Sequence, residues 1–361
     1  MNGTMTCVGL DVHARSTQAA AIDLLSGELH RARFGGGVDP VVGWLRELPG
    51  PVRAAYEAGP TGFALARAAR AAGIELVVVA PSKTPRAPGD RVKTDRKDAE
   101  LIARLLLAGQ LRPVVVPPEW LEAIRHLARA REHVRRDLAR ARHRVSKLLL
   151  LHGRVYPGNT TWNRAHRRWL AAQAFEHEPT ELAYVDLLAA VDGLLARREA
   201  LDERLSRLAH DERLWPTVAR LRSFRGVDTL TALALHLELS GDWQRFGSPR
   251  RLGSWLGPTP SLNQSGESAS QGPISKTGSG IARRLLVEAA WHYAREPRIG
   301  AKLENRQAGQ PGHVLQIAWR AQKRLHRVDR RLRARGKPAN LATVAVAREL
   351  AGFLRAAATA P

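Results

Sequence analysis

Four acidic side chains in the first hundred residues have types and spacings that could hold divalent metal ions. Asp11 ends one predicted strand and Glu57 closes another. Asp95 and Asp98 lie three residues apart on a predicted helix, so they share one face and can converge on one ion. Magnesium takes hard oxygen ligands, and two such ions can stabilise the attacking and leaving oxygens of a phosphoryl displacement. The quartet therefore predicts a two-metal Mg²⁺ site for chemistry at phosphorus.

Each of these acids taken alone has a simpler interpretation. A single carboxylate is more often a surface charge, and Asp95 is a competent helix N-cap by itself. The strand, strand, helix order of the quartet is what favours a shared site. Glu100 is close in sequence but is expected to point elsewhere on the helix. Arg96 and Lys97 could position a phosphate backbone beside the acids, or they could equally keep the acids ionised.

A second candidate for chemistry is the hydroxyl-rich segment of residues 261–280, SLNQSGESASQGPISKTGSG. Such a polar, glycine-rich stretch is usually a flexible linker. A hydroxyl there could instead attack phosphorus, with the cations of Lys276, Arg283 and Arg284 bearing the developing negative charge. Spacing alone does not choose among the serines of this segment, which are Ser261, Ser265, Ser268, Ser270 and Ser275.

The chain as a whole is strongly basic. Its 361 residues include 57 Lys and Arg against 34 Asp and Glu, for a formal net charge of +23. Such a charge favours nucleic acid as the partner, with an anionic membrane surface as the second candidate. No apolar run of about 18 residues is present and the first residues lack a secretory signal, so no membrane partner is expected. The single cysteine, Cys7, excludes an internal disulfide and fits a reducing compartment, so we expect a cytoplasmic, nucleoid-associated protein with Cys7 in a core.

The N-terminal strands and helices must position these acids, and their predicted order is that of an α/β fold. Three strands in a meander are predicted over residues 6–34, followed by alternating helices and strands with a buried strand at 74–80. A loop rich in proline spans residues 81–93 and leads into a helix over 95–108. This order predicts a ribonuclease H-like domain over residues 1–112.

Residues 113–214 are predicted to form a coiled-coil domain. Apolar positions alternate at spacings of three and four from Ile124 to Leu148 and again from Tyr184 to Leu208. Two such seams indicate helices paired with each other or with another subunit, and the alternative is an ordinary two-helix spacer. Arg131 and Arg198 interrupt the seams at equivalent positions.

Basic residues concentrate in two stretches. Between residues 121 and 170 there are 13 basic and three acidic side chains, which favours contacts with a phosphate backbone. Arg135 and Arg142 are the candidates for these contacts. Residues 313–337 are also intensely basic, and they form either a second nucleic-acid surface or a solvated helix.

Residues 215–361 are predicted to form a domain of short helices. Within it, residues 223–234 (SFRGVDTLTALA) resemble a helix-hairpin-helix turn, in which Gly226 permits a tight turn and free backbone N–H groups can bind phosphate. Any connection between two helices can use glycine, so an ordinary turn also fits.

The sequence resembles a known family at both ends. VGLDVH, YEAGPTG and KTDRKDA are similar to the N-terminal catalytic blocks of the DEDD-type insertion-sequence transposases, which are relatives of pilin-gene invertases. SFRGVDTLTALALHLELSGDWQRF, LGSWLGPTPSLNQSGES and ISKTGSGIARRLLVEAAW resemble the C-terminal transposase domain of that family. The resemblance implies a RuvC-like domain, a coiled coil and a helical transposase domain that act together as a DNA recombinase.

The resemblance also implies partners and roles. In this family a structured bridge RNA pairs with donor and target DNA, and carboxylates of one subunit cooperate with a C-terminal serine of another to form a covalent protein–DNA intermediate. Carried onto this chain, the metal ligands are Asp11, Glu57, Asp95 and Asp98. The nucleophile is Ser265, in Gln264-Ser265-Gly266, and the assembly is a dimer or tetramer. Residues 301–337 are longer and more basic than the family pattern.

Two alternatives remain open. A structure-specific junction endonuclease would need only the carboxylates, since hydrolysis forms no serine intermediate. A basic coiled-coil scaffold that binds RNA or DNA without cleaving it would leave the acidic quartet unexplained.

Overall fold

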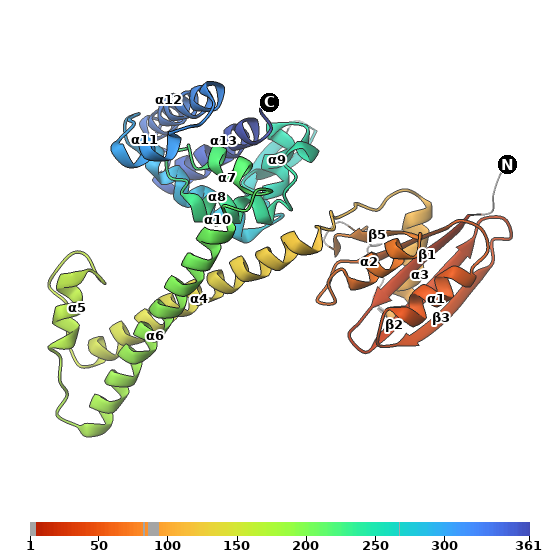
Figure 1. The fold of residues 1–361 in the computed structure, drawn as a ribbon, viewed down its shortest axis with the longest axis horizontal. Coiled ribbons are helices and arrows are strands. Elements are labelled where there is room, and N and C mark those ends of the chain that lie inside the picture. Colours follow the sequence, from red (N-terminus) through yellow and green to blue (C-terminus); the bar gives the residue numbers. More distant parts are fainter. Residues whose placement is uncertain (1–4, 82–83, 86–93, 267) are drawn as a thin grey trace. The chain divides into compact units, whose positions relative to one another are not determined.

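A five-stranded sheet organises the N-terminal part of the chain (Figure 1). The computed structural model describes residues 5–81, 84–85, 94–266 and 268–361, so most of the loop predicted over residues 81–93 lies outside the described residues. The sheet order is β3-β2-β1-β4-β5. The meander is antiparallel and β4 and β5 add to it in parallel. The strands are β1 (Thr6–Val12), β2 (Ser16–Asp23), β3 (Leu29–Gly35), β4 (Val52–Glu57) and β5 (Glu75–Val79).

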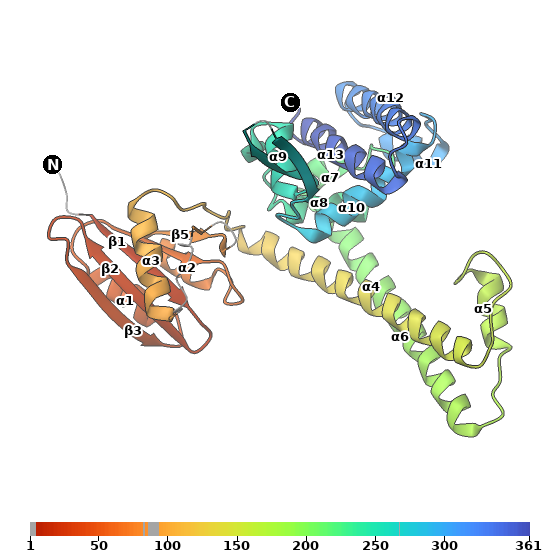
Figure 2. The same cartoon turned by 180° about the vertical axis from the view of Figure 1, so that it is seen from behind.

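Helices cover both faces of this sheet (Figures 1 and 2). The helices α1 (Asp39–Glu47) and α2 (Ala64–Ala71) bury apolar side chains against one face, together with Leu10 and Tyr56. On the other face, Ile102 and Leu106 of α3 (Asp95–Leu107) pack with Cys7 and Ala55. Cys7 is buried, which confirms its prediction as a core residue.

The contact between β1 and α3 depends on Gly9. A Cβ atom at this position would overlap the backbone oxygen of Ala99 and the backbone nitrogen of Ala103. Glycine therefore lets the helix lie directly on the strand, and this contact sets the distance between the end of β1 and the first turn of α3.

Residues 118–361 form the second of two compact units, of which residues 1–117 are the first. Its first elements are two long helices, α4 (Glu119–Leu151) and α6 (Glu178–Leu208), joined through α5 (Arg164–Ala171). Helix α6 returns along α4 with buried apolar side chains between them, and we call this pair the helical hairpin (Figure 2). Its separation from the C-terminal helices as a coiled-coil domain of its own stays a prediction.

The seam between these helices follows the predicted positions over most of its length. Leu138, Ala141 and Val145 are buried, and Arg131 reaches across to Asp202 with Nε 2.7 Å from Oδ1. At the end of α4 the predicted Leu148 packs partly buried against the seam, while the next residue, Leu149, is buried more completely. A straight helix has 3.6 residues per turn, so a strict seven-residue pattern drifts around it.

The remaining helices pack around one core that includes Phe224, Leu233 and Leu350. They are α7 (Trp215–Leu221), α8 (Thr229–Glu238), α9 (Pro249–Leu256), α10 (Gly280–Ala290), α11 (Ala301–Gln307), α12 (Gly312–Ala334) and α13 (Ala339–Ala358), with the short helices η2 (Gln244–Phe246) and η3 (Trp291–Ala294). The predicted mixed α/β part followed by a helical part is confirmed. None of the described helices is long and apolar enough to cross a lipid bilayer.

The polar segment after α9 is not the flexible linker that its composition suggested. It forms an antiparallel pair of strands, β6 (Pro260–Ser265) and β7 (Ser268–Ile274), which we call the serine hairpin. The described side chains of β6 are all exposed, so backbone pairing and not burial of apolar side chains holds the strands together.

Candidate active site

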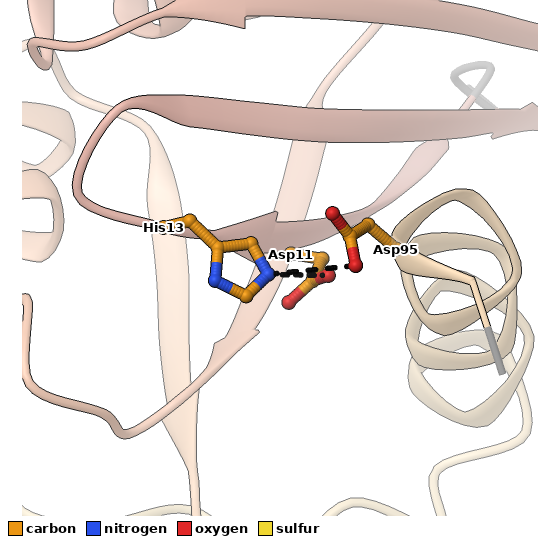
Figure 3. Close-up of side chains that lie close together, drawn as sticks. All are labelled: Asp11, His13 and Asp95. Carbon is orange, nitrogen blue, oxygen red and sulfur yellow. Dashed lines mark hydrogen bonds and ion pairs between the residues drawn. The ribbon is translucent and has the colours of Figure 1, made fainter.

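Asp11, His13 and Asp95 form a compact group of potential metal ligands (Figure 3). His13 Nε2 lies 3.1 Å from Oδ2 of Asp11 and 3.7 Å from Oδ1 of Asp95. One donor atom from each residue falls within 4.8 Å of the other two. The structure therefore brings together two of the four predicted acids, and it adds a histidine that was not predicted.

Strand pairing and helix capping place these side chains. Alternate residues of β1 face α3. Cys7 packs against that helix, and Asp11, four residues later, lies on the same face of the strand. Asp95 is the first residue of α3, and Thr94 is the N-cap, because Thr94 Oγ1 accepts a hydrogen bond from Lys97 N. The capping role considered for Asp95 thus belongs to its neighbour. The carboxylate of Asp95 lies at the positive end of the helix dipole.

Glu57 and Asp98 lie near this group but outside it. Leu10 pairs with Tyr56 in the parallel register, so Asp11 and Glu57 are the next positions along neighbouring strands and alternate onto the same face. Asp98 lies in the first turn of α3, and its charge contributes to the pKa of Asp11. Their service as metal ligands stays a prediction.

The electrostatics of the group favour a bound cation. Burial raises the pKa of Asp11, the charge and hydrogen bond of His13 lower it, and the charges of Asp95 and Asp98 raise it again. A cation would remove the repulsion between these carboxylates. Glu100 lies outside the group, as predicted. Its carboxylate pairs instead with Arg31, whose Nε lies 2.7 Å from Oε1.

The donor set fits a divalent metal ion. Two carboxylates offer the oxygen atoms that Mg²⁺ and Mn²⁺ prefer, whereas an imidazole nitrogen is a ligand more typical of transition metals than of Mg²⁺. His13 is exposed on about half of its side chain, which leaves it accessible to an ion or a substrate. The Asp11-Val12-His13 spacing, with both residues on one side of a strand end, is the signal that could have predicted it.

The serine hairpin presents its hydroxyl groups to solvent. Ser265 pairs with Ser268 and Asn263 with Ser270, so these side chains project from one face of the hairpin. Ser268 Oγ donates to the carbonyl oxygen of Ser265 at 3.0 Å. In the described part of the hairpin, no hydrogen bond engages the hydroxyl of Ser265.

Two other candidate serines have engaged hydroxyl groups. Ser261 Oγ donates to Pro273 O at 3.1 Å, and Ser275 Oγ lies 3.3 Å from Thr277 Oγ1. Like Ser265, Ser270 forms no side-chain hydrogen bond within the described residues of the hairpin. Among the described residues, Ser265 and Ser270 are the candidates whose hydroxyl groups form no hydrogen bond, and the assignment of the nucleophile stays a prediction.

Several predicted contacts to nucleic acid are engaged inside the protein. Arg284 pairs with Glu132 at 2.7 Å and with Glu288 at 2.6 Å, and Arg135 also pairs with Glu132. Arg283 donates to the carbonyl oxygen of Leu256 at 2.8 Å. Their binding to nucleic acid stays a prediction, but each arginine already has a structural partner.

The other predicted contacts are differently placed. Arg96 and Lys97 are exposed beside Asp95, and Arg96 lies 3.5 Å from Glu100. Arg142 stacks over the ring of Trp162 at 4.9 Å. Lys276 is exposed with φ of 54°, and Gly226 has φ of 78° in the turn between α7 and α8.

Comparison with known proteins identifies the chain. The family model for the DEDD transposase domain of IS110, described as a transposase, matches residues 8–153 and fits the ribonuclease H-like fold. A second model, described as the transposase IS116/IS110/IS902 family, matches residues 218–304. The chain is 40% identical over 358 residues to the putative transposase y4qE of Sinorhizobium fredii, covering 97% of this chain and 88% of that protein.

A further relative is named for a particular mobile element. The chain is 31% identical over 339 residues to the transposase for insertion sequence element IS1533 of Leptospira borgpetersenii, covering 91% of this chain and 97% of that protein. Relatives of this similarity over nearly the whole length establish the family. The chain therefore belongs to the IS116/IS110/IS902 family of insertion-sequence transposases, enzymes that cleave and transfer DNA strands.

Proposed function

We propose that this transposase is a metal-dependent, RNA-guided DNA recombinase. In this proposal Asp11, Glu57, Asp95 and Asp98 hold Mg²⁺ ions and Ser265 attacks the DNA backbone. The observation that carries the proposal is the convergence of Asp11 and Asp95, from the end of β1 and the start of α3, within 4.8 Å of each other and of His13. Divalent ions bound there would neutralise charge on the attacking and leaving oxygens of the scissile phosphate.

The residues of the chain have defined tasks in the proposed reaction. The Ser265 hydroxyl forms a bond from Oγ to phosphorus, the bond from phosphorus to the leaving DNA oxygen breaks, and the serine proton passes to a basic group or water. The leaving oxygen takes up a proton. In the second step, a free DNA hydroxyl attacks the phosphoserine, which restores the serine and joins the new strand. The exposure of Ser265, whose hydroxyl forms no hydrogen bond to the described residues, supports this role.

The proposed assembly contains further molecules. A bridge RNA pairs with donor and target DNA, and the carboxylates of one copy act with the serine hairpin of another in a dimer or tetramer. Membership of the family and the net charge of +23 support these partners. The seam of the helical hairpin is filled by α4 and α6 of the same chain, so contacts between copies would use other surfaces.

Strand exchange between donor and target plasmids, with the cognate RNA, tests the proposal. Asp11→Asn and Ser265→Ala should each lower exchange by on the order of 10²-fold or more. Two matched controls should retain exchange: Ser268→Ala removes a hydroxyl already engaged within the hairpin, and Asp39→Asn removes an exposed acid of α1. Normal exchange by either of the first two variants would defeat the roles assigned here.

A denaturing gel distinguishes this proposal from a junction endonuclease. The serine mechanism predicts a DNA adduct that survives denaturation and is absent in Ser265→Ala. Peptide mapping should place it on residue 265 and not on residue 270. Cleavage that leaves no adduct would favour hydrolysis by the carboxylate site alone.

A further inference from the structure

The exposed face of α12 carries a row of cations that the proposed reaction does not use. Lys323, Arg327, Arg330 and Arg331 are exposed and line a hollow of about 550 Å³, whose lining also includes the half-buried His326. Lys323 and Arg327 also line a neighbouring hollow of about 470 Å³. Together these side chains form a continuous basic surface along one helix.

These cations are available to an external anion. Two arginines of the same helix are neutralised within the fold, since Arg324 pairs with Glu349 at 3.0 Å and Arg333 with Asp329 at 2.7 Å. Lys323, Arg327 and Arg330 have no acidic partner within 4.0 Å in the part of the chain that the structure describes. Uncompensated like charges repel one another, so such a row favours a bound polyanion.

An exposed tryptophan lies at each end of this row. Trp319 is 36% exposed, and Lys323 Nζ lies 5.8 Å from its ring centre. Trp291 of η3 is 45% exposed, and Arg333 lies 5.9 Å from its ring centre. Positions 319, 323, 326, 330 and 333 are three or four residues apart, so they share one face over about 21 Å of helix.

The combination of cations and exposed aromatic rings identifies the ligand. Cations bind the backbone of any nucleic acid, but the bases of a duplex are already stacked on one another. Bases of an unpaired strand can stack on aromatic side chains, as in proteins that bind single strands. We propose that this face of α12, together with Trp291, binds an unpaired nucleic-acid strand, with phosphates on the cations and bases on the two indole rings. The same contacts suit RNA and DNA.

Fluorescence anisotropy measures how much the cations of α12 contribute to binding. The full chain is used in EDTA, so that neither metal binding nor cleavage of the probe affects the measured affinity. The probes are oligonucleotides of about 12 residues as single-stranded RNA, single-stranded DNA and duplex DNA. The triple variant Lys323→Gln, Arg327→Gln, Arg330→Gln should bind single strands at least tenfold more weakly. Its salt slope should fall by about two, at ~0.7 per phosphate contact.

A matched triple variant controls for net charge. Arg197→Gln, Arg204→Gln, Arg207→Gln removes three exposed arginines from α6 and should stay within about twofold of the wild-type affinity. Equal losses in the two triple variants would overturn the proposal, because net charge alone would then explain binding.

The aromatic contribution separates unpaired strands from duplexes. Trp291→Ala with Trp319→Ala should weaken single-strand binding by at least about 30-fold, which is about fivefold or more for each lost base contact, and leave duplex binding unchanged. Trp291→Phe with Trp319→Phe keeps a stacking surface and should restore most of the affinity. Equal effects on duplex and single strand, or none on either, would overturn the proposal.

A measurement on the wild-type chain covers the case in which the alanine variant fails to fold. Photocrosslinking with 5-iodouracil in each oligonucleotide should attach the base to Trp291 or Trp319. The more strongly crosslinked and bound of the RNA and DNA probes identifies the natural source of the strand. Crosslinks confined to other parts of the chain would contradict the proposed surface.

Discussion

His13 Nε2 lies 3.1 Å from Oδ2 of Asp11 and thereby joins the turn after β1 to the acidic group at the start of α3. The contact orients the Asp11 carboxylate and partly offsets the rise in its pKa that burial causes. It also gives the site a nitrogen donor in addition to its carboxylate oxygens.

As the pH is lowered, this site should release its divalent ion at a higher pH than a site built from aspartates of ordinary pKa. Burial raises the pKa of Asp11 and His13 lowers it, while a cation requires the ionised carboxylate. His13→Ala removes the lowering contribution, so loss of binding should move to still higher pH. Mn²⁺ binding followed by electron paramagnetic resonance between about pH 4 and 7 measures this change. The exposed His30→Ala provides the control, and identical profiles for His13→Ala and wild type would refute the prediction.

Gly9→Ala should damage both stability and metal binding. The new Cβ meets the backbone of α3, so the helix must move away from β1 and carry Asp95 away from Asp11. We expect a loss of about 3 kcal/mol in the free energy of unfolding, measured with guanidinium chloride. Gly43→Ala is the matched control: it lies in α1 with no atom near its added Cβ, and should gain roughly 0.5–1 kcal/mol. Equal stability of the two variants would show that the close approach of α3 is not required.

The buried carboxylate of Glu132 should be essential for the stability of the second unit. Burial opposes its ionisation, but hydrogen bonds from Arg135 and the charge of Arg284 outweigh this and lower its pKa. Glu132→Gln leaves Arg135 without its anion and Arg284 with Glu288 as its remaining anion, and it should cost about 3–5 kcal/mol in urea unfolding. Glu203→Gln, on the exposed face of α6, should cost less than about 0.5 kcal/mol.

Arg284→Ala separates a structural role of this arginine from contact with nucleic acid. If the pair with Glu132 defines its role, the variant should lose about as much stability as Glu132→Gln. An undiminished stability together with weakened DNA binding would instead support the contact predicted from the sequence.

His236 should make the second unit sensitive to acid. Burial lowers its pKa to about 4, and its Nδ1 accepts a hydrogen bond from Trp243 Nε1. In the unfolded chain the pKa is about 6.5, so below that pH the unfolded state takes up a proton that the folded state excludes. The stabilising contribution is therefore complete above about pH 6.5, and about 3 kcal/mol is lost as the pH falls to about 4.

Denaturation at several pH values compares wild type with His236→Gln, which should lose this component of the pH dependence. The exposed His143→Gln should retain it. A pH dependence unchanged in His236→Gln would mean that another group senses the acid.

The sequence predicted those helices and strands in which buried apolar residues recur at a regular spacing. The meander over residues 6–34, the strand at 74–80 and helix α3 appear within a few residues of their predicted bounds, because the spacing of apolar residues decides which face is buried. The prediction that the strand at 74–80 is buried was wrong, since β5 lies at the edge of the sheet and only Val78 and Val79 are buried. The convergence of Asp11 and Asp95 followed from the strand order. The role of His13 was missed, although its spacing of two residues from Asp11 places both side chains on one face at the end of β1.

The serine hairpin illustrates the opposite case. Its strands bury little, so no apolar alternation marks Ser265 or Ser268 as parts of a sheet. Composition then suggests a linker, while the structure is set by cross-strand hydrogen bonds that any residue can make. The differences among the five serines likewise come from individual hydrogen bonds and not from spacing.

The proposed function depends on acids that are distant in the chain and bind divalent ions together. Iron-directed hydroxyl-radical cleavage tests this shared site most directly. Fe²⁺ bound in place of Mg²⁺ should cut the polypeptide near residues 11–13, near residue 57 and near residues 95–98. Excess Mg²⁺ and Asp11→Asn should both suppress all three cuts. Cuts at only one of these elements, or cuts that persist in Asp11→Asn, would contradict a shared metal site.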